Sequence, residues 1–280
     1  KMKQYRELMD EILTDESPST NLTGIPNLAL FGRQYLVPLS QDEEGIIHGF
    51  PLLTTKKVSL KNIFIELMWK LSGSTNIRPL VEQNVHIWTE WPFKEWLKHE
   101  KRTVIRFTDD TKMKETDEWK ELIGIFEQNI LNDPEFAKTH GSLGFTYGHN
   151  FRHFGSNVLN EGGQDQVREA IMRMENKPDD RRIIINLWDP VNEKNTLLPP
   201  CPCFYQFNAR QDGYLDLQLY QRSCDYFIGV PYNTSQDTLM QCMFAHVTEL
   251  KPRNFIHTFG DVHLYNNHHE QSRLQLSREP

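Results

Sequence analysis

The sequence predicts an α+β fold, in which one large mixed sheet is accompanied by helices. Apolar residues recur at helical spacing in residues 1–13 and 60–71, as they do in amphipathic helices. Residues 215–219 alternate apolar and polar side chains like a half-buried strand, and the nearly continuous apolar run at 182–187 fits a buried one. The order of these segments is neither a strict βαβ repeat nor a sandwich, which indicates a mixed arrangement.

The other predicted elements follow in chain order. Residues 27–37 form a strand between the two amphipathic helices. The composition then shifts to Lys, Glu, Asp and Thr with weaker periodicity, which indicates a small, mainly helical insertion at about 92–140. Apolar residues between 239 and 247 predict a buried helix that begins just after Asn233, and residues 254–259 predict another strand.

Length, charge and cysteine content limit the classes of protein. With 280 residues, 38% of them hydrophobic, the chain is long enough for one large domain spanning residues 1–280. A net charge of -7 argues against a nucleic-acid groove or an anionic membrane surface, so any phosphate recognition must be local. No apolar run of about 18 residues is present, and four cysteines are too few for a disulfide framework. We therefore expect a cytoplasmic protein with reduced thiols and no membrane or nucleic-acid partner.

One cysteine, Cys201, lies in a context that suits a nucleophile. Two prolines precede it in the segment LPPCPCFYQF, and an apolar, aromatic strand follows. A thiol reacts as its thiolate, which needs a nearby cation, and Arg222 in QRSCD offers one. Taken alone, a single cysteine is more often a small buried hydrophobic residue, and the adjacent pair Arg181 and Arg182 is more often a solvated turn.

Eight stretches, in one order along nearly the whole chain, resemble the thymidylate synthases and the related pyrimidine hydroxymethylases. These stretches are Phe50–Lys57, Glu66–Ile77, His86–Trp91, Tyr147–Gly155, Asp179–Trp188, Leu198–Cys201, Gln218–Asn233 and His257–Pro280. The resemblance implies a large sheet flanked by helices, and a homodimer whose sheets pack back to back. It implies deoxyuridylate (dUMP) as substrate and 5,10-methylenetetrahydrofolate as one-carbon donor. It also implies that Arg181 and Arg182 bind the phosphate of the neighbouring subunit's nucleotide.

The resemblance assigns the pyrimidine chemistry to a small group of residues. Cys201 would attack C6 of the uracil, while Arg222 would serve both the thiolate and the phosphate, with Ser223 adding a hydroxyl. Asn233 would read the base, because a carboxamide can donate to O4 and accept from N3–H at once. An aspartate there would suit cytosine. Asn233 could also cap the helix that follows it, and both roles could hold together.

The remaining site residues also come from the resemblance. Glu66, on a helix face with apolar neighbours, would relay protons at the O4 edge through water, and Tyr147 would help to remove the C5 proton. The other residues expected at the nucleotide are Gln221, His263 and Tyr265, and those expected at the folate are Lys56, Trp88, Trp91, Asp225 and Gly229. The histidines 263, 268 and 269 have no ligand set of known spacing, so no metal is expected.

Four departures from the family pattern bear on the product. Leu22 stands where the family has a phosphate-binding arginine, Pro202 where it has histidine, and Thr234–Asp237 where it has Ile-Ala-Ser-Tyr. The carboxy-terminal extension of the family, which excludes water from the site, does not follow Pro280. A wetter site favours attack of water over hydride transfer. The sequence therefore favours a deoxyuridylate hydroxymethylase of the kind found in phages with modified DNA. Such an enzyme would act in the cytoplasm of the host cell. A thymidylate synthase is the alternative, and an inactive binding protein is a remote one.

Overall fold

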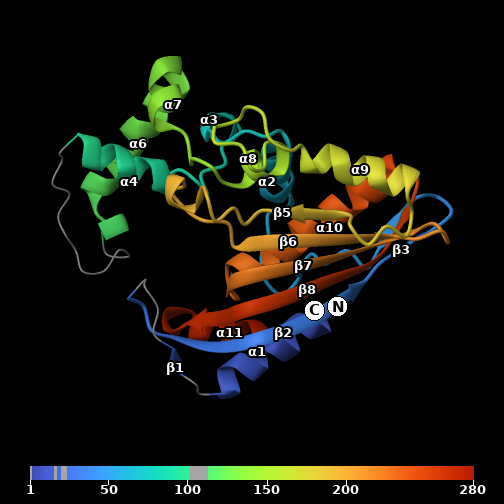
Figure 1. Cartoon of the computed structure of the whole chain (residues 1–280). Coiled ribbons are helices and arrows are strands. Elements are labelled where there is room, and N and C mark those ends of the chain that lie inside the picture. The colour runs from blue at the N-terminus through green and yellow to red at the C-terminus, as the bar shows by residue number, and fades with distance from the viewer. Residues whose placement is uncertain (1, 16–17, 20–23, 101–112) are drawn as a thin grey trace. The chain divides into compact units, whose positions relative to one another are not determined.

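The computed structural model describes residues 2–15, 18–19, 24–100 and 113–280, and its elements are labelled in Figure 1. The chain divides into two compact units. We call residues 1–64, 165–187 and 201–280 the sheet unit, and residues 65–164 and 188–200 the helical unit. That residues 1–280 form a single domain stays a prediction.

The sheet unit is built on a six-stranded mixed sheet in the order β1-β2-β8-β7-β6-β5. Its strands are β1 (Pro18–Ser19), β2 (Asn27–Pro38), β5 (Ile184–Asn186), β6 (Pro202–Ala209), β7 (Tyr214–Asp225) and β8 (Lys251–Tyr265). Neighbouring strands are antiparallel, except that β7 and β8 are parallel. A parallel pair needs a crossover connection, and helix α10 (Gly229–Val247) supplies it. This mixed sheet with helices confirms the predicted fold class.

The period-two pattern of β7 explains which face of the sheet is buried. Leu215, Leu217 and Leu219 are each 0% exposed, whereas Tyr214 and Tyr220 are each 39% exposed. Side chains two apart on a strand share a face. The leucines therefore point toward α10, which packs on β7 and β8, and the tyrosines point to the other face.

The other elements of the sheet unit are short or peripheral. They are α1 (Lys3–Asp15), β3 (Ser40–Gln41), β4 (Ile47–His48), α9 (Gln166–Asn176), η2 (Asn266–His268) and α11 (His269–Leu276). Helix α1 packs along β2, as its amphipathic pattern predicts, and α9 packs on β5. Helix α2 (Leu60–Leu71) contributes residues to both units.

Aromatic contacts hold the helical unit together. Its other helices are α3 (Arg78–Glu82), α4 (Glu90–His99), α6 (Asp117–Asn132), α7 (Pro134–His140), α8 (Tyr147–Arg152) and the 3-10 turn η1 (Glu193–Asn195). The ring centroids of Phe93 and Trp119 are 4.9 Å apart, and those of Trp96 and Phe126 are 5.5 Å apart. Most of the described residues between 92 and 140 lie in α4, α6 and α7.

Helix α10 begins at Gly229, four residues before Asn233, so the prediction that it starts just after Asn233 is wrong. The Asp225 carboxylate explains the earlier start, because its Oδ1 accepts from the backbone N–H groups of Phe227 (3.1 Å) and Ile228 (3.0 Å). These bonds turn the chain into the helix. Asn233 therefore lies inside α10 and does not cap it.

Candidate active site

Cys201 precedes the first residue of β6 and is half-buried. Its carbonyl accepts from the Arg222 backbone N–H at 2.9 Å, so the start of β6 is fixed against β7. The ladder shifts register between Pro202 and Phe204. Proline has no N–H to donate and is tolerated at the first residue of a strand, and a bulge there redirects the neighbouring side chains. Pro202 thus sets the bend beside the candidate nucleophile.

The other three cysteines are poor candidates for a nucleophile. Burial raises the pKa of the Cys203 and Cys224 thiols above the ordinary value, and it raises the pKa of Cys242 to about 11. The positive charge of Arg222 opposes this effect on the pKa of Cys203, so the guanidinium acts close to the Cys201–Cys203 pair. That Arg222 serves the Cys201 thiolate stays a prediction.

Strand β7 and helix α10 bring Gln221 and Asn233 together. The Gln221 amide donates through Nε2 to Asn233 Oδ1 at 3.1 Å, and to the Ser223 carbonyl at 3.0 Å. Gln221 is 2% exposed, whereas Asn233 and Ser223 are half-buried and so accessible to a ligand. The carboxamide of Asn233 is therefore held by the residue that precedes Arg222 in β7, and Ser223 follows Arg222 in the same strand.

Behind Gln221 lies a chain of buried polar groups that the sequence reading missed. His257 Nε2 lies 2.9 Å from Gln221 Oε1, and His257 Nδ1 lies 3.0 Å from Thr234 Oγ1. Thr234 Oγ1 in turn lies 2.6 Å from the Tyr35 hydroxyl. Burial lowers the pKa of His257 to about 3, so the imidazole is neutral. We call Tyr35, Thr234, His257 and Gln221 the buried polar chain.

His263 and Tyr265 share one face of β8, two residues apart, with ring centroids 5.1 Å apart. His263 is 7% exposed, and its Nδ1 lies 2.8 Å from Asp261 Oδ1. The Asp261 carboxylate accepts a hydrogen bond from Nδ1–H, so Nε2 is the acceptor of the neutral ring. This arrangement suits the hydroxyl donor expected from a ribose.

The structure places Arg181 and Arg182 away from Cys201 of the same chain. The Arg181 carbonyl accepts from Gln206 of β6, five residues beyond Cys201, a separation of about 17 Å along a strand. Arg182 is exposed, with 77% of its side chain accessible, and its Nε donates to Asp180 at 2.9 Å. The hydrogen bonds from Arg182 and Arg173 lower the pKa of Asp180 to about 2. Arg181 and Arg182 therefore do not lie beside Cys201 of their own chain.

The start of α10 at Gly229 lies close to three other side chains, those of Lys56, Asp225 and Phe227. The Lys56 ammonium donates to the Phe227 carbonyl and lies 3.8 Å from the centre of the Phe227 ring. Burial lowers the pKa of Lys56, and the charge of Asp225 opposes that shift. A Cβ on Gly229 would meet Asn233 Oδ1 at 3.5 Å, an ordinary contact. The cluster thus offers a cation, a carboxylate and a ring face.

In the helical unit, the side chains of Glu66, Trp88 and Tyr147 lie close together. Glu66 is 7% exposed, and its Oε1 accepts from Trp88 Nε1 at 2.8 Å and from Lys70 at 2.9 Å. Lys70 also lies over the Tyr147 ring, 4.6 Å from its centre, and the Trp88 and Tyr147 rings are 5.3 Å apart. The sequence reading missed Lys70, although its i,i+4 spacing from Glu66 was a usable signal. Trp91, which is also expected at the folate, is half-buried. The centre of its ring lies 5.9 Å from Lys94 Nζ.

Two of the departures from the family pattern can be located in the structure, whereas Leu22 lies outside the described residues. Pro202 begins β6, as described above. Asp237 is 3% exposed, and its Oδ1 accepts from the Tyr205 hydroxyl at 3.1 Å. The carboxylate of Asp237 is therefore bonded to the core.

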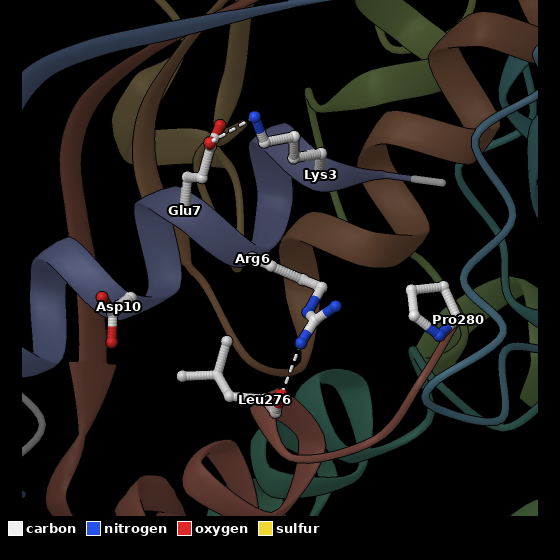
Figure 2. A pocket seen from close by; sticks show the side chains of 6 residues that line it. All are labelled: Lys3, Arg6, Glu7, Asp10, Leu276 and Pro280. Carbon is white, nitrogen blue, oxygen red and sulfur yellow. Dashed lines mark hydrogen bonds and ion pairs between the residues drawn. The ribbon is translucent and has the colours of Figure 1, made fainter.

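The pocket in Figure 2 is a different place from these clusters. It lies in the sheet unit between α1 and the carboxy-terminal end of α11, and its lining consists of Lys3, Arg6, Glu7, Asp10, Leu276 and Pro280. Arg6 donates to the Leu276 carbonyl at 2.5 Å across it. The described part of the chain has no group of three or more His, Cys, Asp or Glu placed to hold a metal ion. Nor does any helix of that part have the length and apolarity to cross a membrane.

Comparison with known proteins identifies the class of enzyme. Residues 3–280 match the family described as "Thymidylate synthase". The chain is 41% identical over 279 residues to the thymidylate synthase of Mesoplasma florum, covering 100% of this chain and 86% of that protein. It is 39% identical over 280 residues to the thymidylate synthase of Malacoplasma penetrans, covering 100% and 86%. For the thymidylate synthase of Leuconostoc mesenteroides, identity is 41% over 283 residues, covering 99% and 85%.

These likenesses define a folate-dependent enzyme that transfers a one-carbon group to C5 of a pyrimidine nucleotide. The chain belongs to the thymidylate synthase family. This confirms the family resemblance and sets aside the inactive binding protein. All three relatives are named thymidylate synthase, which was the alternative function. The hydroxymethylase that the sequence favoured, and its assignment to a phage, gain no support.

Proposed function

We propose that this chain is a thymidylate synthase that converts dUMP and 5,10-methylenetetrahydrofolate into thymidylate and dihydrofolate. The observation that carries the proposal is the cluster of a half-buried Cys201, the adjacent Arg222 and the Asn233 carboxamide held by Gln221. Three relatives about 40% identical along the whole chain bear this name and support the same choice of product.

In the proposed reaction, the Cys201 thiolate bonds to C6 of the uracil and makes C5 nucleophilic. Arg222 stabilises the thiolate, and Arg222 and Ser223 bind the phosphate. The amide of Asn233 donates to O4, and its Oδ1, which has a second lone pair beyond the one taken by Gln221, accepts from N3–H. His263, with Nε2 available as an acceptor, and Tyr265 bind the ribose hydroxyl.

Proton transfers are assigned to residues of the helical unit. The buried Glu66 carboxylate, held by Trp88 and Lys70, relays a proton at the O4 edge. Tyr147, whose ring lies beside the Lys70 ammonium, assists the removal of the C5 proton. Once C5 has received the folate's one-carbon unit and hydride, elimination of the Cys201 thiolate from C6 would release thymidylate and restore the free cysteine.

The folate would supply the one-carbon unit and the hydride. The donor set around the start of α10 suits a flat, nitrogen-rich ring, because Asp225 can accept from ring N–H groups while Phe227 offers a face and Lys56 a charge. We assign Lys56, Asp225 and Gly229 to this ligand, together with Trp88 and Trp91 of the helical unit.

A homodimer with shared phosphate sites fits the sheet unit. Leu36 (44% exposed), Phe204 (37%) and Tyr220 (39%) lie on the sheet face opposite α10, and Phe204 and Tyr220 are direct cross-strand partners. A second copy packed on this face would bury these side chains and would bring its exposed Arg181 and Arg182 to a neighbouring nucleotide. Sedimentation should show a dimer, and Leu36→Lys should weaken it; a wild-type monomer would contradict this assembly.

Product analysis tests the proposed function. After incubation with dUMP and methylenetetrahydrofolate, mass spectrometry should find thymidylate, and absorbance should show one dihydrofolate for each thymidylate. Cys201→Ser should abolish turnover, whereas Cys242→Ser, which changes a cysteine outside the site, should retain it. A 5-hydroxymethyl product without dihydrofolate would overturn the proposal in favour of the hydroxymethylase.

A further inference from the structure

The hydrogen bonds of the buried polar chain have one donor-to-acceptor direction, and the Ser223 backbone carbonyl fixes that direction. Gln221 Nε2 faces the Ser223 carbonyl at 3.0 Å, an acceptor that cannot change its role. If the Gln221 amide were reversed, its oxygen would face that carbonyl, and two acceptors would meet. The amide nitrogen therefore points toward Ser223 and Asn233, and Oε1 points toward His257.

The roles of the other groups in the buried polar chain follow because each has a single proton to donate. Because Gln221 Oε1 only accepts, the neutral His257 carries its proton on Nε2 and donates it over 2.9 Å. His257 Nδ1 then accepts, so Thr234 must donate its single hydroxyl proton over 3.0 Å. Thr234 Oγ1 in turn accepts from the Tyr35 hydroxyl at 2.6 Å. The direction runs from Tyr35 to Asn233 without a break.

Burial makes this direction costly to reverse. Tyr35 is 7% exposed, Thr234 is 1%, His257 is 0% and Gln221 is 2%. A buried donor or acceptor that loses its partner is not rescued by water, so all four groups must keep compatible roles.

We propose that Tyr35, Thr234 and His257 are positioning residues that fix the orientation of the Asn233 carboxamide through Gln221, and that this orientation selects uracil over cytosine. Gln221 donates to Asn233 Oδ1, so the oxygen stays on that side and the amide nitrogen on the other. Uracil offers N3–H and O4, which match this orientation. Cytosine offers the opposite pattern and would require the amide to flip, which would set Asn233 Nδ2 against Gln221 Nε2, donor against donor. The inference rests on the proposed function in assigning the base to Asn233.

Two variants and one control test the proposal. Thr234→Val keeps the shape but removes the donor to His257, and Tyr35→Phe removes the first donor of the chain. Tyr5→Phe is the control, because it also deletes a buried tyrosine hydroxyl, one that donates to the Tyr226 carbonyl at 3.1 Å and lies outside the chain. The readouts are the His257 tautomer by nitrogen-15 NMR and the equilibrium binding of dUMP and dCMP.

In the wild type we expect His257 to be protonated on Nε2 and dUMP to bind more tightly than dCMP. Thr234→Val should reduce that preference about fivefold to tenfold, the effect of one lost buried hydrogen bond, and Tyr35→Phe should reduce it less. Tyr5→Phe should leave it unchanged. A wild-type His257 protonated on Nδ1, or a Thr234→Val preference within twofold of wild type, would overturn the inference. If the wild-type protein bound neither nucleotide, the proposed function and base selection would fail together, while the tautomer would still decide the direction of the chain.

Discussion

The buried ion pair of Glu66 and Lys70 gives the sharpest prediction of stability. Their side chains are 10% and 6% exposed, their charged atoms are 2.9 Å apart, and Trp88 supplies one further donor to the same carboxylate oxygen. In Lys70→Met the methylene stem is roughly kept and the ammonium is lost, which leaves a buried carboxylate without its counter-charge. Breaking a buried pair in this way costs about 3–5 kcal/mol, so we expect the free energy of unfolding to fall by that amount.

Urea unfolding followed by tryptophan fluorescence measures this loss. All six tryptophans, at positions 69, 88, 91, 96, 119 and 188, belong to the helical unit, so the signal reports on the unit that contains the pair. Lys98→Met is the matched control in the same unit, since Lys98 pairs with Glu95 at exposures of 72% and 41% and should contribute only about 0–1 kcal/mol. The double change Glu66→Leu with Lys70→Met should recover much of the stability. A loss below about 1 kcal/mol in Lys70→Met would refute the reasoning.

Three further predictions concern the sheet unit. Iodoacetamide at pH 8 should modify Cys201 at least about tenfold faster than the other thiols, whose pKa values burial raises, and peptide mapping that found another cysteine modified first would contradict this. Burial lowers the pKa of His257 from 6.5 to about 3, so below pH 6.5 the unfolded chain takes up a proton that the folded chain refuses. Stability should fall by up to about 1.4 kcal/mol per pH unit from 6.5 toward 3, and urea unfolding of His257→Gln should show a shallower slope by that amount. Mixing Cys201→Ser with the double variant Arg181→Gln/Arg182→Gln should restore about a quarter of wild-type activity through hybrid dimers, and no recovery would argue against a shared site.

Local patterns predicted the elements that carry the site. The alternation at 215–219 lies within β7, and the aromatic run after Cys201 forms β6. Because these strands are antiparallel neighbours, they set the backbone of Cys201 against that of Arg222, the pairing that the proposed nucleophile needs. The start of α10 could not be predicted from these patterns. It depends on the hydrogen bond that the Asp225 carboxylate accepts from the Phe227 backbone N–H.

The buried polar chain could not be read from the sequence. Tyr35 and Thr234 are 199 positions apart, and Gln221 and His257 are 36 apart, so no local spacing links them. Their contact depends on β8 pairing with both β2 and β7. The Glu66–Lys70 pair differs, because i,i+4 spacing on a helix was enough to suggest it.

The position of β8 inside the sheet also governs how the protein can fold as it is made. Strand β2 ends at Pro38, but its partner β8 begins only at Lys251, so a ladder of eleven residue pairs cannot form until all the residues between them have been synthesised. At about 5–20 residues per second, β2 would wait roughly 10–40 s on the ribosome with its hydrogen-bonding edge unsatisfied. Its exposed Gly32 and half-buried Arg33 interrupt the apolar run during that interval, as charges and glycines do in strands that must not pair early. The sheet that carries the nucleophile is thus closed by a strand that is synthesised long after β2.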